Sequence, residues 1–262
     1  MDSDSAIINQ HLKIIRKRIL HASFNSKDGH IPSAFSILEI LWAVFLEIPK
    51  KTQLVLNSDF EVVLSKGHAS MALYGILEEI GVIDSEWIHS FGQFESDFGG
   101  HPDSRKIPAV ILSSGSLGHG LPFAVGRILA NRIRDKNKRI IVIVGDGELN
   151  EGSNWEALML AEAHQLSELL LIVDFNNSTD RSLPISNLKG KLEQFGFHTL
   201  IVQGHDVEQI VDASTKEFER GPVAIIANTI KGFGIKDMEN NHAWHHLTPS
   251  QEQMEKFLEE LS

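Results

Sequence analysis

The chain has 262 residues, of which 42% are hydrophobic, and this length suits one large α/β domain with a sizeable buried core. It carries 24 basic and 35 acidic side chains, a formal net charge of −11, which makes nucleic acid and anionic membranes poor partners. The chain has no cysteine, and this excludes disulfides, thiolate zinc sites, iron–sulfur clusters and cysteine nucleophiles. Any metal site must therefore use oxygen and nitrogen ligands.

The amino-terminal region predicts two helices and no targeting segment. It starts acidic and lacks the basic-then-apolar order of a signal peptide, and no apolar run in the chain approaches the ~20 residues that span a bilayer. We therefore expect a cytoplasmic protein. Apolar residues at helical spacing over 7–20 predict an amphipathic helix, and residues 33–47 predict a largely buried helix that Pro49 ends.

A strand, a helix and a long irregular segment are expected next. Residues 60–65 (FEVVLS) are typical of a strand, and residues 65–81 are typical of a loop followed by a helix. Residues 85–120 are rich in Gly, Ser, His and Pro, which predicts a long stretch with little regular structure. Long loops in compact domains tend to carry function, so this segment is a candidate for part of a site.

From residue 121 onward, short apolar runs alternate with amphipathic segments. The predicted helices are 121–134, 153–165 and 206–220, and the predicted strands are 139–144, 169–174, 198–203 and 223–229. This alternation predicts an α/β fold of three layers, a mostly parallel sheet with helices on both faces. Because no repeat or linker interrupts it, we expect one domain over residues 1–262.

Three polar or glycine-rich motifs follow predicted strands. GDGELNEG comes after 139–144, DFNNS after 169–174 and TIKGFG after 223–229. Ligands in open α/β sheets bind outside the carboxyl ends of the strands. The three motifs are therefore expected to share one edge of the sheet and to form the site there.

The GDGELNEG motif does not match two common glycine-rich loops. A dinucleotide fingerprint would need its third glycine at Asn150, and Asp146 stands between the first two glycines, where a bare carboxylate repels pyrophosphate. An EF-hand loop counted from Asp146 would place Gly152 at position 7 instead of 6 and Ala157 at the bidentate position 12. A cation between Asp146 and a diphosphate is the remaining chemical solution.

Asp146 and Asn176 together predict a magnesium site. Asn176 lies at the end of the next predicted strand, and adjacent parallel strands bring the two side chains within reach of one ion. Mg2+ prefers a few protein oxygens together with phosphate oxygens and water. The alternative is an acidic turn and an Asn-rich turn without metal. The occurrence of both motifs at adjoining strand ends favours the metal site.

Many ordered motifs surround these two residues. They are DGHIPSAFSILEIL, FEVVLSKGHASMALYGILEEIGVI, FGGHPD, SSGSLGHGLPFAVG, GDGELNEGSNWEALMLAEAHQLSELLLIVDFNN, TIKGFG and MENNHAWHH. In this order they resemble the amino-terminal, thiamine-diphosphate-binding half of transketolases, whose diphosphate and metal motif begins GDGELNEG-x-WEA and closes on Asn. The resemblance runs from about His11 to about His246, which is nearly the whole chain.

The resemblance implies thiamine diphosphate as cofactor, bound through Mg2+, with Ca2+ or Mn2+ as alternatives. It implies that the side chains of Asp146 and Asn176 and the carbonyl of Ser178 hold the metal, and that the Gly147 N–H binds the diphosphate. The implied cofactor-binding residues are His68, Gly115, Ser116, Leu117, Gly118, Gly145, Asp146, Gly147, Glu148, Asn176, Ser178 and His245.

Four histidines match active-site positions of the family. They are His30, His68, His101 and His245. In the family these residues line the funnel to the thiazolium and help to move protons, a task that suits imidazole because its unperturbed pKa of ~6.5 lies near neutrality. Five other histidines are expected to be surface or hydrogen-bonded core residues. They are His11, His21, His89, His164 and His198.

Several positions are less certain in role or depart from the family pattern. His119 stands where many members have Gln, and Glu151 and Glu156 match carboxylates that meet across the dimer interface. Ile31-Pro32-Ser33 replaces small residues, which predicts a narrower funnel. In the loop 177–182, Asp180 stands where an apolar residue usually lies under the thiazolium. His246 stands where relatives carry Gly.

The chain ends at Ser262, before the pyrimidine-binding and third domains of a full transketolase. The resemblance therefore implies a split enzyme that transfers a two-carbon ketol unit from a ketose to an aldose. A second chain would supply the pyrimidine-binding domain, in a heterotetramer with two copies of each. Alternatives are another thiamine-dependent ligation, of the 1-deoxyxylulose-phosphate synthase type, and a degenerate, non-catalytic scaffold.

Overall fold

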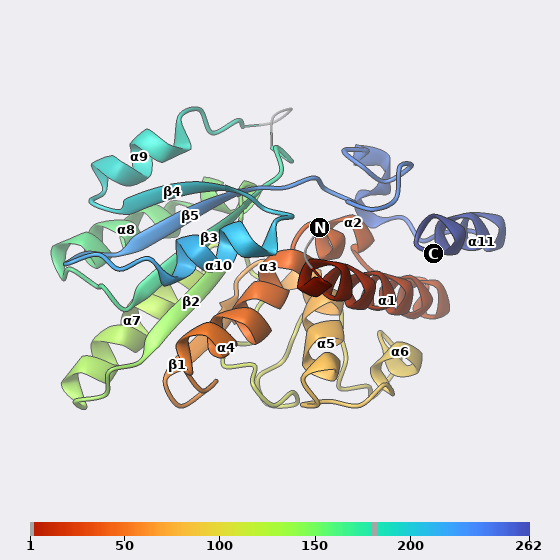
Figure 1. Cartoon of the computed structure of the whole chain (residues 1–262), viewed down its shortest axis with the longest axis horizontal. Helices are drawn as coiled ribbons and strands as arrows, with labels where there is room; N and C mark the ends of the chain where they lie inside the picture. The colour runs from red at the N-terminus through yellow and green to blue at the C-terminus, as the bar shows by residue number, and fades with distance from the viewer. Residues whose placement is uncertain (1–2, 180–182) are drawn as a thin grey trace.

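A parallel sheet forms the centre of the computed structural model, which describes residues 3–179 and 183–262 (Figure 1). The strands, in the spatial order β1-β2-β3-β5-β4, are β1 Phe60–Leu64, β2 Arg139–Gly145, β3 Leu169–Phe175, β5 Val223–Asn228 and β4 His198–Gln203. Every neighbouring pair in this sheet is parallel. All the carboxyl ends therefore lie along one edge, as the alternation of elements predicted.

Side chains of alternate strand residues enter two hydrophobic clusters, one on each face of the sheet. In β2, Ile141 and Ile143 pack into one cluster, whereas Val142 and Val144 pack into the other. Both faces are thus buried, which is why these strands are continuous apolar runs. The predicted fold of three layers is confirmed.

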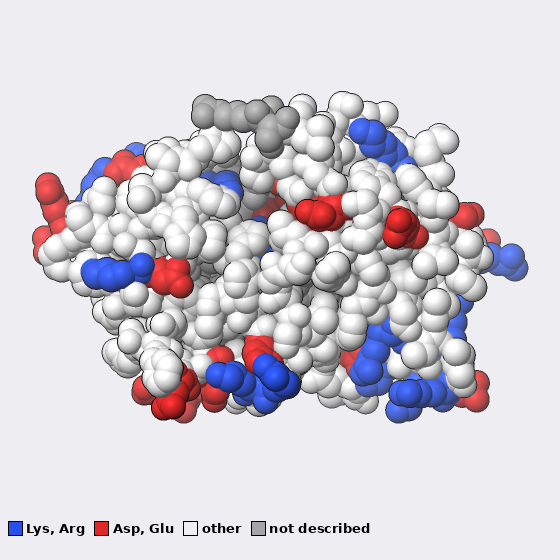
Figure 2. Space-filling view, turned by 180° about the vertical axis from the view of Figure 1, so that it is seen from behind, with Lys and Arg blue, Asp and Glu red and all other residues white. Residues whose placement is uncertain are grey.

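Helices cover both faces. They are α1 Ser3–Ser26, α2 Ile31–Phe35, α3 Leu38–Trp42, α4 Ile48–Thr52, α5 Ser70–Glu79, α6 Trp87–Ser90, α7 Gly120–Ile133, α8 Gly152–Ala163, α9 Leu188–Gln194, α10 Val207–Thr215 and α11 Gln251–Glu260. The helices α7, α8 and α9 pack on one face, and α10, α3 and the amino-terminal helices pack on the other. In Figure 2, which views the molecule from the side of α7 and α8, charged side chains lie mainly toward the edges.

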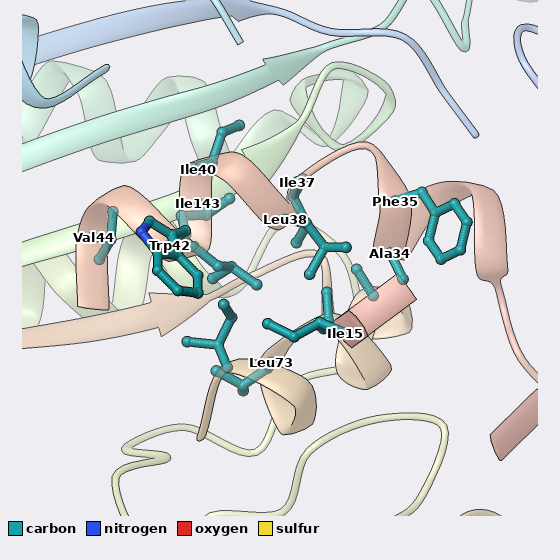
Figure 3. Close-up of a cluster of buried hydrophobic side chains, with 14 of the residues drawn as sticks. Ile15, Ala34, Phe35, Ile37, Leu38, Ile40, Trp42, Val44, Leu73 and Ile143 are labelled. Carbon is teal, nitrogen blue, oxygen red and sulfur yellow. The ribbon is translucent and has the colours of Figure 1, made fainter. Parts of the chain in front are cut away.

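The amino-terminal helices form the larger core cluster with the sheet. Figure 3 shows Ile15 of α1, Phe35 of α2, Leu38 of α3 and Leu73 of α5 close to Ile143 of β2, and all five are buried. This packing holds the segment around α2 against the edge of the sheet where the strands end. The amino-terminal region therefore contributes to the site although it contains none of the strands.

The predicted helix over 33–47 is wrong in its continuity and in its end. The chain there forms α2, α3, a π-helical turn over Ala43–Glu47, and α4. Pro49 lies in the first turn of α4, where its missing N–H leaves no helical hydrogen bond unmade, so it begins a helix rather than ending one.

Two helices were not predicted, and one is shorter than expected. The helices α9 and α11 lie outside the predicted elements, although Ser250 and Gln253 form a capping box at the start of α11, which is a signal visible in the sequence. The helix α10 ends at Thr215 and not at residue 220. The other predicted helices and strands are confirmed, and α6 is the one regular helix within 85–119. No described helix is long and apolar enough to cross a membrane.

Candidate functional site

The carboxyl ends of four strands bring polar side chains together at one edge of the sheet. Lys66 and His68 follow β1, Asp146 follows β2, Asn176 follows β3 and Lys231 follows β5. Asp146 and Asn176, at the ends of the paired strands β2 and β3, are adjacent as predicted. The structure therefore places the three strand-end motifs in one site.

Asp146 is a buried carboxylate with three hydrogen-bond donors. Its Oδ1 accepts from the Gly147 N–H at 2.7 Å and from the Ser178 hydroxyl at 2.6 Å, and its Oδ2 accepts from the Ser178 N–H at 2.9 Å. The same Ser178 N–H lies 3.1 Å from the Asn176 Oδ1. The three residues expected to hold a metal ion are thus in mutual contact.

The amide of Asn176 is oriented by two buried acceptors. Its Nδ2 donates to the Ser36 hydroxyl and to the Asp174 carboxylate, both at 3.0 Å, so its Oδ1 is turned toward Ser178 and Asp146. Such outer partners commonly orient metal ligands.

The donor set fits Mg2+. Within residues 3–179 and 183–262, no group of three His, Cys, Asp or Glu side chains could hold a metal ion. An ion at Asp146 must therefore bind a mixed set of carboxylate, amide and carbonyl oxygens, completed by phosphate oxygens and water. This is the coordination that Mg2+ prefers.

Asp174, which the sequence interpretation did not single out, joins three strand ends. It is fully buried, and its carboxylate accepts from the Lys66 ammonium, from the Thr229 hydroxyl, and from the Ser36 hydroxyl at 2.7 Å. A charged residue at the end of an otherwise apolar strand is seldom fully buried unless it is paired, so this position carried a usable signal.

Lys231, also missed, adds a second buried cation to the site. Its Nζ lies 3.0 Å from the Nδ1 of His245, and burial together with the charge of Lys66 lowers the pKa of Lys231 to about 8. Lys66 and Lys231 place positive charge beside Asp146, where a diphosphate would need it. Both lysines belong to quoted motifs, SKGH and TIKGFG.

Glu148 connects the loops that surround this edge. Its buried carboxylate accepts from the Ser65 hydroxyl, from the Gly118 N–H at 3.0 Å and from the Gly145 N–H at 3.3 Å. Burial raises the pKa of Glu148. The side chain thus links the SKGH, SGSLGHG and GDGELNEG segments, whereas its predicted contact with a cofactor stays a prediction.

Two glycines allow the SGSLGHG loop to lie close to its neighbours. Gly118 has a φ of +81°, and a Cβ there would lie 2.5 Å from the Glu151 Cβ. A Cβ at Gly120 would lie 2.2 Å from the Ser65 Oγ, to which the Gly120 N–H donates. Any larger residue would separate these loops and move the backbone at this end of the sheet.

Four histidines from distant segments form one cluster centred on His30. The ring centroid of His30 lies 5.3 Å from that of His68, 5.4 Å from that of His245 and 4.4 Å from that of His246. His101, an exposed residue whose ring lies against Gly115, is close enough for its charge to affect His30. The structure therefore brings the four predicted active-site histidines together and adds His246.

Burial keeps the inner histidines neutral. It lowers the pKa of His30 to about 4, together with repulsion from His246, His245 and His101. It lowers the pKa of His68 to about 2, together with the charge of Lys66. At neutral pH these imidazoles can accept a proton or a hydrogen bond.

The other named positions lie outside this cluster. His119 is exposed at the start of α7, and Glu151 and Glu156 are exposed at and near the start of α8, so their predicted interface role stays a prediction. His21, His89 and His164 are exposed, while His11 and His198 bond to Glu79 and to the Arg220 carbonyl, as expected for surface or hydrogen-bonded residues.

Two of the positions that depart from the family pattern have different outcomes. The side chains of Ile31, Pro32 and Ser33 are buried in α2, and the Pro32 carbonyl accepts from the Gly232 N–H at 3.0 Å. They pack within the protein, and the narrower funnel stays a prediction. Asp180, with the rest of 180–182, lies outside the described residues.

Comparison with known proteins agrees with this site. The family model for the transketolase thiamine diphosphate binding domain matches residues 7–261. One of the two kinds of chain of the apulose-4-phosphate transketolase of Actinobacillus succinogenes, named as a subunit, is 36% identical, over 97% of this chain and 95% of that one. The 6-deoxy-6-sulfo-D-fructose transketolase subunit SqwG of Clostridium sp. is 31% identical, over 99% and 98%.

Longer transketolases match over part of their length. Human transketolase is 32% identical over 94% of this chain but only 41% of its own length. The crystal structure of Campylobacter jejuni transketolase superimposes with a TM-score of 0.87 at 28% identity, over 100% of this chain and 43% of that one. These relatives do not favour the alternatives of another thiamine-dependent ligation or a scaffold. The chain belongs to the transketolase family, in which it corresponds to the thiamine diphosphate-binding domain.

Proposed function

We propose that the chain is the cofactor-binding subunit of a split transketolase, which transfers a two-carbon ketol unit from a ketose to an aldose. The observation that carries this proposal is the joint placement of Asp146, Asn176 and Ser178 at the ends of β2 and β3, beside two buried lysines and a cluster of histidines. An oxygen set for Mg2+, a cationic surround and neutral bases are what binding of thiamine diphosphate and proton transfer require.

The residues at the strand ends would bind the diphosphate. The Asp146 and Asn176 side chains and the Ser178 carbonyl would hold Mg2+, or Ca2+ or Mn2+ in its place, while the Gly147 N–H and Lys231 bind phosphate oxygens. The loop over Gly115–Gly118 would lie along the cofactor. When bound, thiamine diphosphate supplies a nucleophilic carbon and an electron sink for carbon–carbon cleavage.

The histidine cluster would manage protons on the substrate. His30 and His68 are neutral at neutral pH because burial lowers their pKa values, so each can accept a proton from a sugar hydroxyl and return it. His245, whose Nδ1 faces Lys231, and His101 would orient the substrate at the outer side of the cluster. His68 and His245 would also contact the cofactor.

A partner chain would complete the active site. Two relatives that match nearly end to end are named as transketolase subunits, whereas full transketolases are more than twice as long. The side that carries α7 and α8 has few charged atoms near its centre (Figure 2), and Met159 and Leu160 of α8 are exposed there, which suits a protein interface. We propose a heterotetramer in the cytoplasm, with residues 1–262 as one domain in each copy and with sugars or sugar phosphates as substrates.

The experiment mixes the chain with the subunit that carries the pyrimidine-binding domain and measures ketose-to-aldose transfer with thiamine diphosphate and Mg2+. Asp146→Ala should abolish transfer and weaken Mg2+-dependent cofactor binding in calorimetry by more than about 100-fold, because it removes the one carboxylate ligand. Asp212→Ala, which removes a carboxylate paired with Lys51 on the surface, is the control and should change neither. Unchanged cofactor affinity in Asp146→Ala would contradict the metal assignment.

A further inference from the structure

His246 extends the histidine cluster toward solvent. Its ring centroid lies 4.4 Å from that of His30 at an interplanar angle of 83°, and its Nε2 lies 3.4 Å from the Asp28 Oδ1. The side chains of His246 and Asp28 are 58% and 46% exposed, whereas His30 and His68 are largely buried. The cluster thus runs from a buried inner end at His68 to an open outer end at His246.

Asp28 and His246 approach this outer end from opposite parts of the chain. Asp28 lies between α1 and α2, where its Oδ1 also accepts from the Gly29 N–H at 2.7 Å, and its Oδ2 lies beside the backbone at Gly100. His246 ends the short 3-10 helix over His242–His246. The pair therefore bridges two walls of the opening, next to the segment that carries His101.

The chemistry of the pair suits a hydroxyl group. The imidazole offers a hydrogen-bond donor and the carboxylate offers an acceptor, and a hydroxyl can satisfy both at once. An anionic group would instead meet the charge of Asp28. Neither side chain is needed to hold the fold, because both are exposed and their mutual contact is long.

We propose that His246 and Asp28 form a subsite for the hydroxyl-bearing carbons of the sugar that extend beyond the reacting carbon, and that this subsite sets which acceptors are used. The inference rests on the proposed function and deepens it. If the reacting carbonyl lies at the inner histidines, the remaining sugar chain must leave the site past His30, and the next side chains outward are His246 and Asp28. A short aldehyde would not extend to them.

The test compares two acceptors in the complete enzyme, with both kinds of chain present and with hydroxypyruvate as donor. Glycolaldehyde has two carbons, and D-erythrose has two further hydroxyl-bearing carbons. His246→Gly should lower kcat/KM for D-erythrose at least about tenfold more than for glycolaldehyde, as expected for the loss of a hydrogen bond of about 1.4 kcal/mol. His246→Asn, which keeps a donor, should recover part of the difference.

The matched control is His242→Gly, in the same 3-10 helix, where glycine has the same effect on the backbone. It should leave the ratio between the two acceptors unchanged. Equal losses for both acceptors in His246→Gly, or the same change of ratio in His242→Gly, would overturn the subsite alone. Absence of transfer to either acceptor by the unmodified enzyme would overturn the proposed function and the subsite with it.

Discussion

Buried charges at the strand ends give individual residues their roles. Asp174 is surrounded by donors from three strand ends, and Lys66 is paired with it, so that charge is neutralised within the protein. Among the residues that the structure describes, Lys231 has no carboxylate within hydrogen-bond distance, and its pKa is lowered to about 8. Lys231 is therefore the residue of these three whose charge a bound anion would stabilise.

Lys231 should make cofactor binding depend on pH. Its folded-state pKa of about 8 means that the ammonium is lost as pH rises through 8, while a bound diphosphate favours the charged form. Affinity for thiamine diphosphate with Mg2+ should therefore be highest below pH 8 and fall above it, by at most about tenfold per pH unit. Calorimetry between pH 7 and 9 measures this.

Lys231→Arg is the matched control for the pH dependence. Arginine remains charged throughout this range, so the affinity of the variant should be nearly constant from pH 7 to 9. The same decline above pH 8 in wild type and variant would show that another group is responsible.

The motifs predicted some of these residues and missed others for a physical reason. Asp146 and Asn176 could be found because their spacing follows from two adjacent strands. Lys66 and Lys231 could not, because a lysine in a sequence is by default a solvated cation. Their burial depends on how four segments pack at one edge of the sheet.

At the scale of elements, one loop is held by a buried network from two helices. Arg16 of α1 donates to Glu39 of α3 at 2.6 Å, and the other Glu39 oxygen lies 3.0 Å from the His205 Nδ1. The Ile230 N–H donates to the His205 Nε2 at 2.8 Å, so the imidazole proton lies on Nδ1 and is donated to Glu39. The Phe233 ring stacks on His205 with centroids 3.7 Å apart.

This network positions the segment that follows β5. Arg16 also donates to the Phe233 carbonyl at 3.2 Å, and although burial opposes it, the charges of Arg16 and His205 lower the pKa of Glu39. Lys231 lies between the two anchored residues Ile230 and Phe233. The network therefore determines where the Lys231 ammonium lies relative to the ends of β2 and β3.

His205→Ala should loosen this segment. The Ile230 N–H loses its acceptor and Phe233 loses its stacking partner, so hydrogen exchange at 229–235 should accelerate at least about tenfold, and cofactor affinity should fall several-fold. His198→Ala is the control, because His198 also stacks on a phenylalanine and also bonds to the backbone, but at the opposite end of the sheet. Unchanged exchange at 229–235 in His205→Ala would show that the network does not position the loop.

Helix existence was easier to predict than helix continuity. The apolar character of 33–47 correctly indicated a buried segment, but its division into α2, α3 and the π-helical turn was not visible. Hydrophobic periodicity reports which residues are buried and not where the backbone must bend to pack against the sheet. For α11, the capping box was a local signal, and the helix could have been predicted from it.

At the scale of the whole molecule, the histidine cluster depends on long-range packing. His30, His68, His101 and His245 come from four segments that are separated in sequence by the strands and helices of the core. Their approach places several imidazoles in one partly buried volume, which favours the neutral forms. The cluster therefore links the stability of the fold to pH.

The protein should lose stability as pH falls below neutrality. The pKa of His30 is about 4 in the folded chain and about 6.5 when unfolded, so the unfolded chain binds more protons as pH falls through 6.5, and this favours unfolding. The free energy of unfolding should fall between pH 6.5 and 4 by at most about 1.4 kcal/mol per pH unit from His30. Urea unfolding at pH 7, 6 and 5 measures the slope.

His30→Asn should reduce this slope, because it removes one titrating group from the cluster. His21→Asn, at an exposed helix position, should leave the slope as in wild type. Equal slopes for all three proteins would mean that His30 is not kept neutral by the fold.

By itself, the sequence determined the parallel α/β fold and the family, because apolar runs, strand spacing and ordered motifs are local properties of the chain. The Asp146–Asn176 pairing also followed from the order of adjacent strands. Only the tertiary structure decided that Asp174 joins three strand ends, that Lys231 is buried with a pKa of about 8, and that His246 meets Asp28. Desolvation and contact between distant segments arise only when the chain packs, and these effects give the residues of the site their charge and position.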